Sequence, residues 1–237
     1  MTEKVFYQDS YQKTHRSEVV AVQEGAVILA ATIFYPLGGG QPGDTGKLDI
    51  NGREYRVVDT RYAEDRNRIL HFLEDSETDG INPGDPVEME IDWQRRHRLM
   101  RMHTSMHLVC SLITAQATGG SVGETASRLD FDLQGQVVDK EQLTTELNAL
   151  VQQGLPVEIG SISDQELDQN PELVRTMSVQ PPRGAGTVRT ISIKDTDYQP
   201  CGGTHVNNTA EIGELLVSSI KNKGKQNKRI NLTLVNP

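Results

Sequence analysis

Cysteine is scarce in this sequence, because its 237 residues include only Cys110 and Cys201. Two cysteines cannot form a disulfide framework, so we expect reduced thiols and a cytoplasmic protein. Aromatic residues are few as well, and no apolar run approaches the roughly 20 residues that span a bilayer. The first residues show no basic-then-apolar pattern, which argues against a secretory signal. We therefore expect a protein of one large domain or two small ones, with no membrane partner.

Acidic side chains outnumber basic ones, and the formal net charge of −9 alone argues against a nucleic-acid partner. The basic residues, however, are concentrated in two segments. Residues 91–107 contain four arginines and one acid, and residues 215–237 contain five basic side chains and no acidic one. Such segregation can place basic patches on an acidic body, while an ordinary solvated surface is the alternative.

The first ninety residues are rich in short β-branched runs separated by glycine, proline and asparagine turns. Such spacing is typical of a small barrel or sandwich, and we take the barrel as the prediction for a domain over residues 1–92. The expected strands cover residues 18–23, 26–33, 47–50, 54–59, 69–72 and 87–91. No helix of normal length is expected in this part.

From residue 93 the apolar period changes to three and four, without Gly or Pro until about residue 117. We predict one long amphipathic helix there, with Asp92 as N-cap and Gly119-Gly120 as the stop. Helices at 139–153 and 164–170 and strands at 127–133, 156–161, 187–193, 212–220 and 230–235 follow. The fold class is thus α+β: a small β-barrel, then a two-layer α/β domain over 93–237 with the long helix against an antiparallel sheet.

Two pairs of side chains have the spacing of a metal site. His103 and His107 lie four residues apart on the long helix, so both project from one face. Cys201 and His205 are separated by Gly-Gly-Thr, and a positive φ at Gly202 and Gly203 would turn both side chains inward. Three imidazoles and a thiolate are a typical donor set for one Zn²⁺. Cys110 is interpreted as a core residue.

These motifs resemble those of the alanyl-tRNA editing domain. His103-Thr-Ser-Met-His107 and Cys201-Gly-Gly-Thr-His205 look like its two metal motifs, and residues 34–46 are similar to its glycine-rich motif. Arg128-Leu-Asp-Phe131 is similar to its strand after the metal helix, and residues 221–230 to its turn before a final strand. The resemblance covers nearly the whole chain, as in the free-standing AlaX-type proteins of intermediate size that keep the glycine-rich N-terminal domain.

The resemblance implies hydrolysis in trans of the ester that joins serine, and sometimes glycine, to alanine tRNA. It implies zinc ligation by His103, His107, Cys201 and His205, and a glycine-rich loop of Gly38, Gly39, Gly40 and Gln41 that presents the tRNA end. This loop lacks the Lys-Ser/Thr of a nucleoside-triphosphate site, so ATP is not expected. Expected tRNA contacts are the basic residues of the two segments, namely Arg95, Arg98, Lys221, Lys223, Lys225, Lys228 and Arg229. A monomer or a weak dimer is expected.

Serine is larger than alanine, so sparing the correct product requires a polar contact to the serine hydroxyl. Met106 stands where relatives often carry Thr, which leaves Thr104 and Thr118 as candidates, with Arg128 and Asp130 as further substrate contacts. The sequence leaves open whether the metal activates water or only positions the substrate. A non-catalytic zinc-containing tRNA-binding module, or editing of another aminoacyl-tRNA, is the alternative function.

Overall fold

The computed structural model describes residues 1–23, 25–176, 186–224 and 227–236. The chain forms two compact units. The first contains residues 1–38 and 42–97, and the second contains residues 39–41 and 98–237. The domain boundary predicted at 92/93 stays a prediction.

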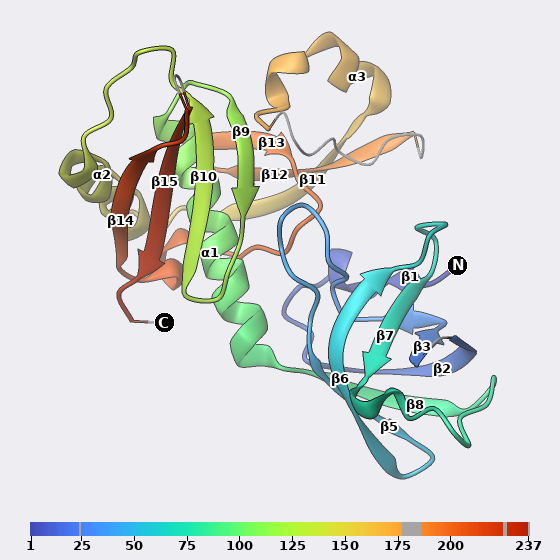
Figure 1. Ribbon diagram of the computed structural model, residues 1–237. Coiled ribbons are helices and arrows are strands. Elements are labelled where there is room, and N and C mark those ends of the chain that lie inside the picture. The colour runs from blue at the N-terminus through green and yellow to red at the C-terminus, as the bar shows by residue number, and fades with distance from the viewer. Residues whose placement is uncertain (24, 177–185, 225–226, 237) are drawn as a thin grey trace. The chain divides into compact units, whose positions relative to one another are not determined.

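The first unit is a closed antiparallel barrel with the strand order β2-β3-β7-β6-β5-β8 (Figure 1). Alternate residues point into it, as in β8, where Val87, Met89 and Ile91 are buried between exposed neighbours. This confirms the predicted small barrel and the absence of a normal helix, since the described residues before 92 contain only two 3-10 turns. The barrel strands are β2 (Thr14–Gln23), β3 (Ala26–Leu29), β5 (Gly46–Ile50), β6 (Arg53–Tyr62), β7 (Ile69–Leu73) and β8 (Pro86–Ile91), and β1 (Glu3–Lys4) pairs in parallel with β4 (Ala31–Thr32).

A buried ion pair joins the end of the glycine-rich motif to the start of the long helix within the first unit. The Arg96 guanidinium is fully buried and donates to the Asp44 carboxylate. It also donates to the carbonyls of Ser10, at 3.1 Å, and Ile33, at 2.7 Å. Arg96 is therefore a structural residue of the barrel unit, although it lies in a segment that the sequence marks as basic.

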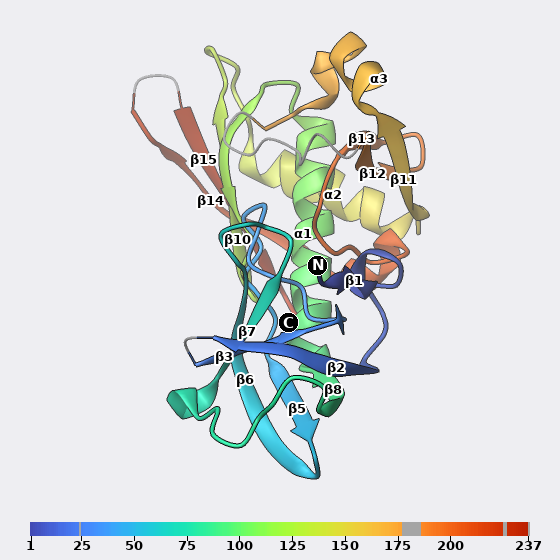
Figure 2. The ribbon, with the colours of Figure 1, turned by 90° about the vertical axis from the view of Figure 1, so that its right-hand side faces the viewer.

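Helix α1 (Trp93–Leu112) has its first five residues in the first unit and the rest in the second. In the second unit it lies between two sheets, as Figure 2 shows. The predicted strands of this half are thus divided between two sheets. A four-stranded sheet has the order β14-β15-β10-β9, and a three-stranded sheet has the order β11-β12-β13. Their strands are β9 (Ala117–Ser121), β10 (Ala126–Asp132), β11 (Val157–Ser163), β12 (Thr187–Ile193), β13 (Asp197–Pro200), β14 (Leu215–Asn222) and β15 (Asn227–Leu234).

The shorter helices lie where the sequence predicts them. Helix α2 (Lys140–Gln152) begins at Asp139, whose side chain accepts a hydrogen bond from the Gln142 amide, and buries Leu143, Leu147 and Val151. Helix α3 (Asp164–Gln169) begins at Ser163 with a reciprocal capping box to Glu166. Helices and strands together confirm the α+β class.

The long helix ends five residues earlier than predicted. The Arg175 side chain donates to the carbonyls of Cys110, at 2.6 Å, and Ile113, at 2.8 Å, which caps the last turn of α1. The predicted stop, Gly119-Gly120, lies instead within β9, paired with β10. Within the described part of the chain, no helix has the length and apolar character of a membrane span.

Candidate metal centre and its surroundings

The first two donors come from one face of α1. His103 and His107 are almost fully buried, and their ring centroids lie 5.6 Å apart. They follow each other by one helical turn, as the spacing predicts.

The other two donors come from the loop after β13. A single nitrogen of Arg189, on β12, donates to the carbonyls of Cys201, at 2.7 Å, and Gly203, at 2.9 Å. The backbone of Arg189 accepts a hydrogen bond from the Cys201 amide. Arg189 therefore fixes the short loop on both sides of Gly202.

Glycine is needed at 203 for space rather than for a positive φ. Neither Gly202 nor Gly203 lies in the left-handed region, so the predicted reason for these glycines is wrong. A Cβ at Gly203 would lie 2.1 Å from Cε1 of His103, which no side chain tolerates. The loop approaches the helix so closely that only a hydrogen fits.

The four predicted donors form one cluster, with one ligand atom from each residue lying within 4.8 Å of the others. Cys201 Sγ lies 3.3 Å from His205 Nε2 and 3.6 Å from His103 Nε2. Zinc bonds of about 2.0–2.1 Å to nitrogen and about 2.3 Å to sulfur would place tetrahedral donors about 3.3–3.6 Å apart. The donor set and these distances fit a tetrahedral Zn²⁺, and the cluster is able to hold a metal ion.

Each imidazole is held from behind through Nδ1, so that Nε2 is left for the cluster. His103 Nδ1 donates to Gln41 Oε1 at 2.9 Å, and His107 Nδ1 donates to the Asp197 carboxylate at 2.8 Å. His205 Nδ1 donates to the Thr104 hydroxyl at 3.1 Å. Such outer partners select the tautomer whose lone pair can bind a metal.

The buried charges of the cluster shift the ionisation of its members. Burial raises the pKa of Cys201, but the neighbouring His103 and His205 outweigh it and hold that pKa well below its usual value, so the thiolate is favoured. Burial lowers the pKa of His107, but the Asp197 hydrogen bond and Cys201 outweigh it and raise that pKa to about 10. Burial and the neighbouring His103 lower the pKa of His205. A thiolate among imidazoles is a strong metal-binding arrangement.

Part of the glycine-rich loop belongs to the second unit. Gln41 is fully buried there, where its Oε1 also accepts from the Thr204 amide at 3.1 Å and its Nε2 donates to the Thr204 hydroxyl at 2.8 Å. Gly40 has a φ of +81°, and a Cβ there would lie 3.2 Å from the Gly120 carbonyl. Gly39 and Gly40 belong to the second unit, whereas Gly38 lies in the first.

The predicted substrate residues lie in two places. The Thr104 hydroxyl donates to the Met100 carbonyl and accepts from His205 and the Val206 amide, so it supports a metal donor. Thr118, predicted at the end of the helix, lies on β9, where its hydroxyl donates to the Asp130 carbonyl at 3.2 Å. Asp130 in turn accepts from Arg128.

The predicted basic residues are not one continuous face. Arg95 donates to the Gly43 carbonyl in the first unit, and Arg98 pairs with Glu124 in the second. Lys223 and Arg229 both pair with Asp130, while Lys228 donates to Asn222. Lys221 is exposed on β14, and Lys225 lies outside the described residues.

Three supporting residues are absent from the sequence prediction: Asp197, Gln199 and Arg189. Gln199 donates to the Asp197 carboxylate at 2.9 Å, next to His107. Asp197, Gln199 and Cys201 alternate along one strand, a period-two pattern that could have placed them together. Arg189 carries no such signal, because its role depends on a loop twelve residues away.

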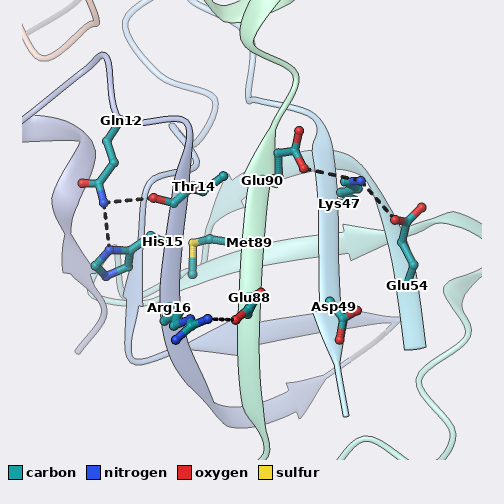
Figure 3. A pocket seen from close by; sticks show the side chains of 10 residues that line it. All are labelled: Gln12, Thr14, His15, Arg16, Lys47, Asp49, Glu54, Glu88, Met89 and Glu90. Atoms are coloured by element: carbon teal, nitrogen blue, oxygen red, sulfur yellow. Dashed lines mark hydrogen bonds and ion pairs between the residues drawn. The ribbon is translucent and has the colours of Figure 1, made fainter. Parts of the chain in front are cut away.

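A hollow of about 650 Å³ lies elsewhere, on the barrel wall over β2, β5, β6 and β8 (Figure 3). Among its charged side chains, Arg16 pairs with Glu88, and Lys47 pairs with both Glu54 and Glu90. It contains one histidine and no cysteine, so it lacks the donor chemistry of the metal cluster.

Comparison with known proteins matches both units. Residues 2–95 match the family described as tRNA synthetases class II (A), and residues 188–231 match the family described as the threonyl and alanyl tRNA synthetase second additional domain. The second match includes Cys201 and His205. The AlaX-M alanyl-tRNA editing protein of Methanosarcina barkeri is 36% identical over 246 residues, which cover 99% of this chain and 100% of the relative. The chain belongs to the AlaX-M alanyl-tRNA editing protein family.

Membership of the AlaX-M family confirms the resemblance inferred from the motifs. The AlaX-M protein of Saccharolobus solfataricus is 34% identical, with 99% of each chain covered. The alanine–tRNA ligase of Sulfurisphaera tokodaii is 35% identical over 230 residues, but these make up only 25% of the ligase. The similarity to the AlaX-M proteins thus runs from end to end, whereas the ligase contains an AlaX-like part within a much longer chain.

Proposed function

We propose that this protein is a zinc-dependent aminoacyl-tRNA deacylase, which hydrolyses in trans the ester of alanine tRNA mischarged with serine and, in some cases, glycine. The observation that carries the proposal is the four-donor cluster, whose three imidazoles are each oriented through Nδ1. The AlaX-M relatives, named as alanyl-tRNA editing proteins, supply the substrate class.

His103, His107, Cys201 and His205 would hold the zinc, which when bound supplies a Lewis acid and a rigid anchor for the site. Four protein donors fill a tetrahedral shell, so the arrangement supports a centre that organises the site more than one with an open position. Gln41, Thr104 and Asp197 keep the donors oriented. The ester of an aminoacyl-tRNA is itself reactive, so positioning and modest polarisation are sufficient.

The test uses alanine tRNA charged with serine or with alanine, incubated with the protein before and after chelation. We expect rapid release of serine, slow release of alanine, and loss of both activities on chelation. A double variant, Cys201→Ala with His205→Ala, should lose metal and activity. The control is Cys110→Ala, which removes a buried thiol outside the cluster and should keep both.

A non-catalytic tRNA-binding module is the second candidate, because a closed shell of four donors is also typical of structural zinc. The same experiment separates the two functions. An enzyme shortens the lifetime of the seryl ester, whereas a binding module leaves it unchanged or extends it.

We propose a hydroxyl contact as the basis of selectivity for serine. Among the described residues, the Thr118 hydroxyl makes two long hydrogen bonds, at 3.2 and 3.4 Å, whereas the Thr104 hydroxyl has three partners. Thr118→Val should reduce the preference for serine over alanine by about 1–3 kcal/mol with zinc retained. Thr104→Val is the comparison, and it should also weaken metal binding through His205. Unchanged selectivity in both variants would reject both residues.

A further inference from the structure

Three cations converge on one carboxylate in the four-stranded sheet of the second unit. Arg229 binds Asp130 with two parallel hydrogen bonds, from Nε to Oδ1 at 2.7 Å and from Nη2 to Oδ2 at 2.9 Å. Arg128 Nη1 and Lys223 Nζ reach the same Oδ2 at 2.9 and 2.8 Å. Asp130 with Arg128, Lys223 and Arg229 is called the Asp130 cluster.

The cluster lies on the face of this sheet opposite α1. A side chain at Gly120 on β9 would meet both Met106 of α1 and Leu129 of β10, so Leu129 faces α1. Because side chains alternate along a strand, Asp130 points to the opposite face of the sheet. Figure 2 shows α1 on one side of this sheet only. Arg229 is directly opposite Asp130 on β15, and Gly119 is opposite it on β9.

Burial separates the acid from the bases. The Asp130 side chain is only 3% exposed, whereas those of Arg128, Lys223 and Arg229 are 37%, 54% and 29% exposed. Viewed from solvent, the cluster therefore presents N–H donors with the carboxylate beneath them. Gly119, beside the Asp130 carboxylate, adds no side chain to the cluster.

The number of cations exceeds what the carboxylate needs. One cation balances the charge of the carboxylate, so the three cations leave these four side chains with a net charge of +2. Like charges held this close repel each other, and an anion bound between them would reduce that repulsion. Lys221 on β14 is directly opposite Arg229 on β15 and adds another exposed cation on the same face.

We propose that the Asp130 cluster binds phosphodiester groups of an RNA backbone, and that Asp130 is a positioning residue that holds the three cations in place. This rests on the proposed function, which makes a tRNA the substrate. An anion that enters the cluster meets arginine N–H groups already fixed in direction, so little side-chain freedom is lost on binding.

For Asp130→Asn, the proposal and simple electrostatics predict opposite changes in RNA binding. This change removes a negative charge, so simple electrostatics predicts tighter RNA binding. If Asp130 positions the cations, binding weakens instead: we expect KM for mischarged tRNA to rise roughly 3- to 10-fold at unchanged kcat, with the salt slope lower by about 0.7–0.9. The control is Asp132→Asn, which makes the same charge change two residues along β10 and should bind as tightly as the wild type or more so.

A second variant covers the case in which Asp130→Asn does not fold. Lys223→Gln leaves both arginines paired with Asp130. We expect the affinity for tRNA and the salt slope of binding to fall by the amount expected for one phosphate contact. Lys140→Gln, which removes another paired lysine of the second unit, is the control and should change neither. Wild-type KM and salt slope in Asp130→Asn, or in Lys223→Gln where the first is unfolded, would overturn the proposal.

Binding of uncharged alanine tRNA keeps this test independent of catalysis. A wild-type protein that binds this tRNA through the Asp130 cluster but does not hydrolyse the ester would reject the proposed function and support the cluster. A protein that hydrolyses the ester with Asp130→Asn indistinguishable from wild type would do the reverse. Inorganic phosphate added at constant ionic strength should not compete with the tRNA. A site for free phosphate would be saturated by the added phosphate, and tRNA binding would then be lost.

Discussion

Single residues decide whether the metal donors can meet. Any side chain at Gly203 would overlap the His103 ring, and Arg189 fixes the carbonyls on either side of Gly202. The spacing of Cys201 and His205 marks them as donors, but the reason for the glycine at 203 is the closeness of His103, which is 98 positions from Cys201. A local sequence pattern therefore cannot predict that close approach.

Gly203→Ala should abolish stoichiometric metal binding. Its Cβ would overlap the His103 ring, so the loop must move away and the donors separate. Metal content per chain is the measurement, with circular dichroism to verify the fold. Gly135→Ala is the control: its φ of +94° makes it strained by about 1 kcal/mol, yet its Cβ would meet nothing within 4 Å, so full metal content is expected. A metal-loaded Gly203→Ala protein would contradict this account.

His71 makes the stability of the barrel depend on pH. Its ring is fully buried between the Thr32 hydroxyl and the Val27 carbonyl, and burial lowers its pKa from 6.5 to about 4. Between these values the unfolded chain binds a proton that the folded barrel does not. The stabilisation that depends on a neutral His71 should therefore be fully present above pH 6.5. The free energy of unfolding should fall by about 3 kcal/mol as the pH drops to 4.

Trp93 provides the measurement for His71. It is the one tryptophan of the chain and packs against the barrel core, so its fluorescence follows denaturant unfolding of this unit. The His71→Gln variant lacks the titrating ring, and its unfolding free energy should change less between pH 6.5 and 4. Parallel pH profiles for the two proteins would show that His71 is not the group responsible.

At the scale of elements, β13 carries much of the site. Asp197 and Gln199 lie on it at alternate positions, and Cys201 follows in the same register. The strand thus delivers a metal donor and the carboxylate that orients His107 together. No strand is predicted over these residues from the sequence, because a segment of four residues with two buried side chains is too short to recognise from its pattern alone.

Asp197→Asn should weaken metal binding by roughly 10- to 100-fold without unfolding the protein. The amide keeps the shape of the side chain but loses the charge that orients and polarises His107. Competition with a chromogenic chelator measures the affinity. Asp195→Asn, which removes an exposed carboxylate in the adjacent turn, should bind metal like the wild type. Equal affinities in the two variants would assign Asp197 a packing role only.

Elements with a strong local signal were predictable, and those that depend on distant partners were not. The barrel strands and α2 follow from period two and from a capped amphipathic stretch. The end of α1 depends on Arg175, and β9 exists because its glycines pair with β10. Likewise the four donors follow from spacing, whereas Gln41 reaches His103 across 62 residues of sequence.

At the scale of the whole chain, a bound metal would join two distant segments. His103 and Cys201 are 98 residues apart, and a link between them restricts the unfolded chain much as a disulfide does. A bound metal would therefore contribute to folding as well as to the site.

Chelation should lower the melting temperature of the second unit by roughly 10 °C, since a ligand present at a thousand times its Kd stabilises a protein by about 4 kcal/mol. Calorimetry with and without chelator measures the shift, and added Zn²⁺ should restore it. The double variant Cys201→Ala with His205→Ala should melt at one temperature under both conditions. A wild-type melting temperature that does not change on chelation would show that the metal does not contribute to stability.

The separation of the donors also sets the order in which the site is made. During translation the two histidines of α1 leave the ribosome long before Cys201 and His205 exist. A nascent or interrupted chain therefore offers only a pair of imidazoles, which bind metal weakly compared with four donors. Metal acquisition would then be a late step of biogenesis, because a filled site requires that both segments have been synthesised and brought together.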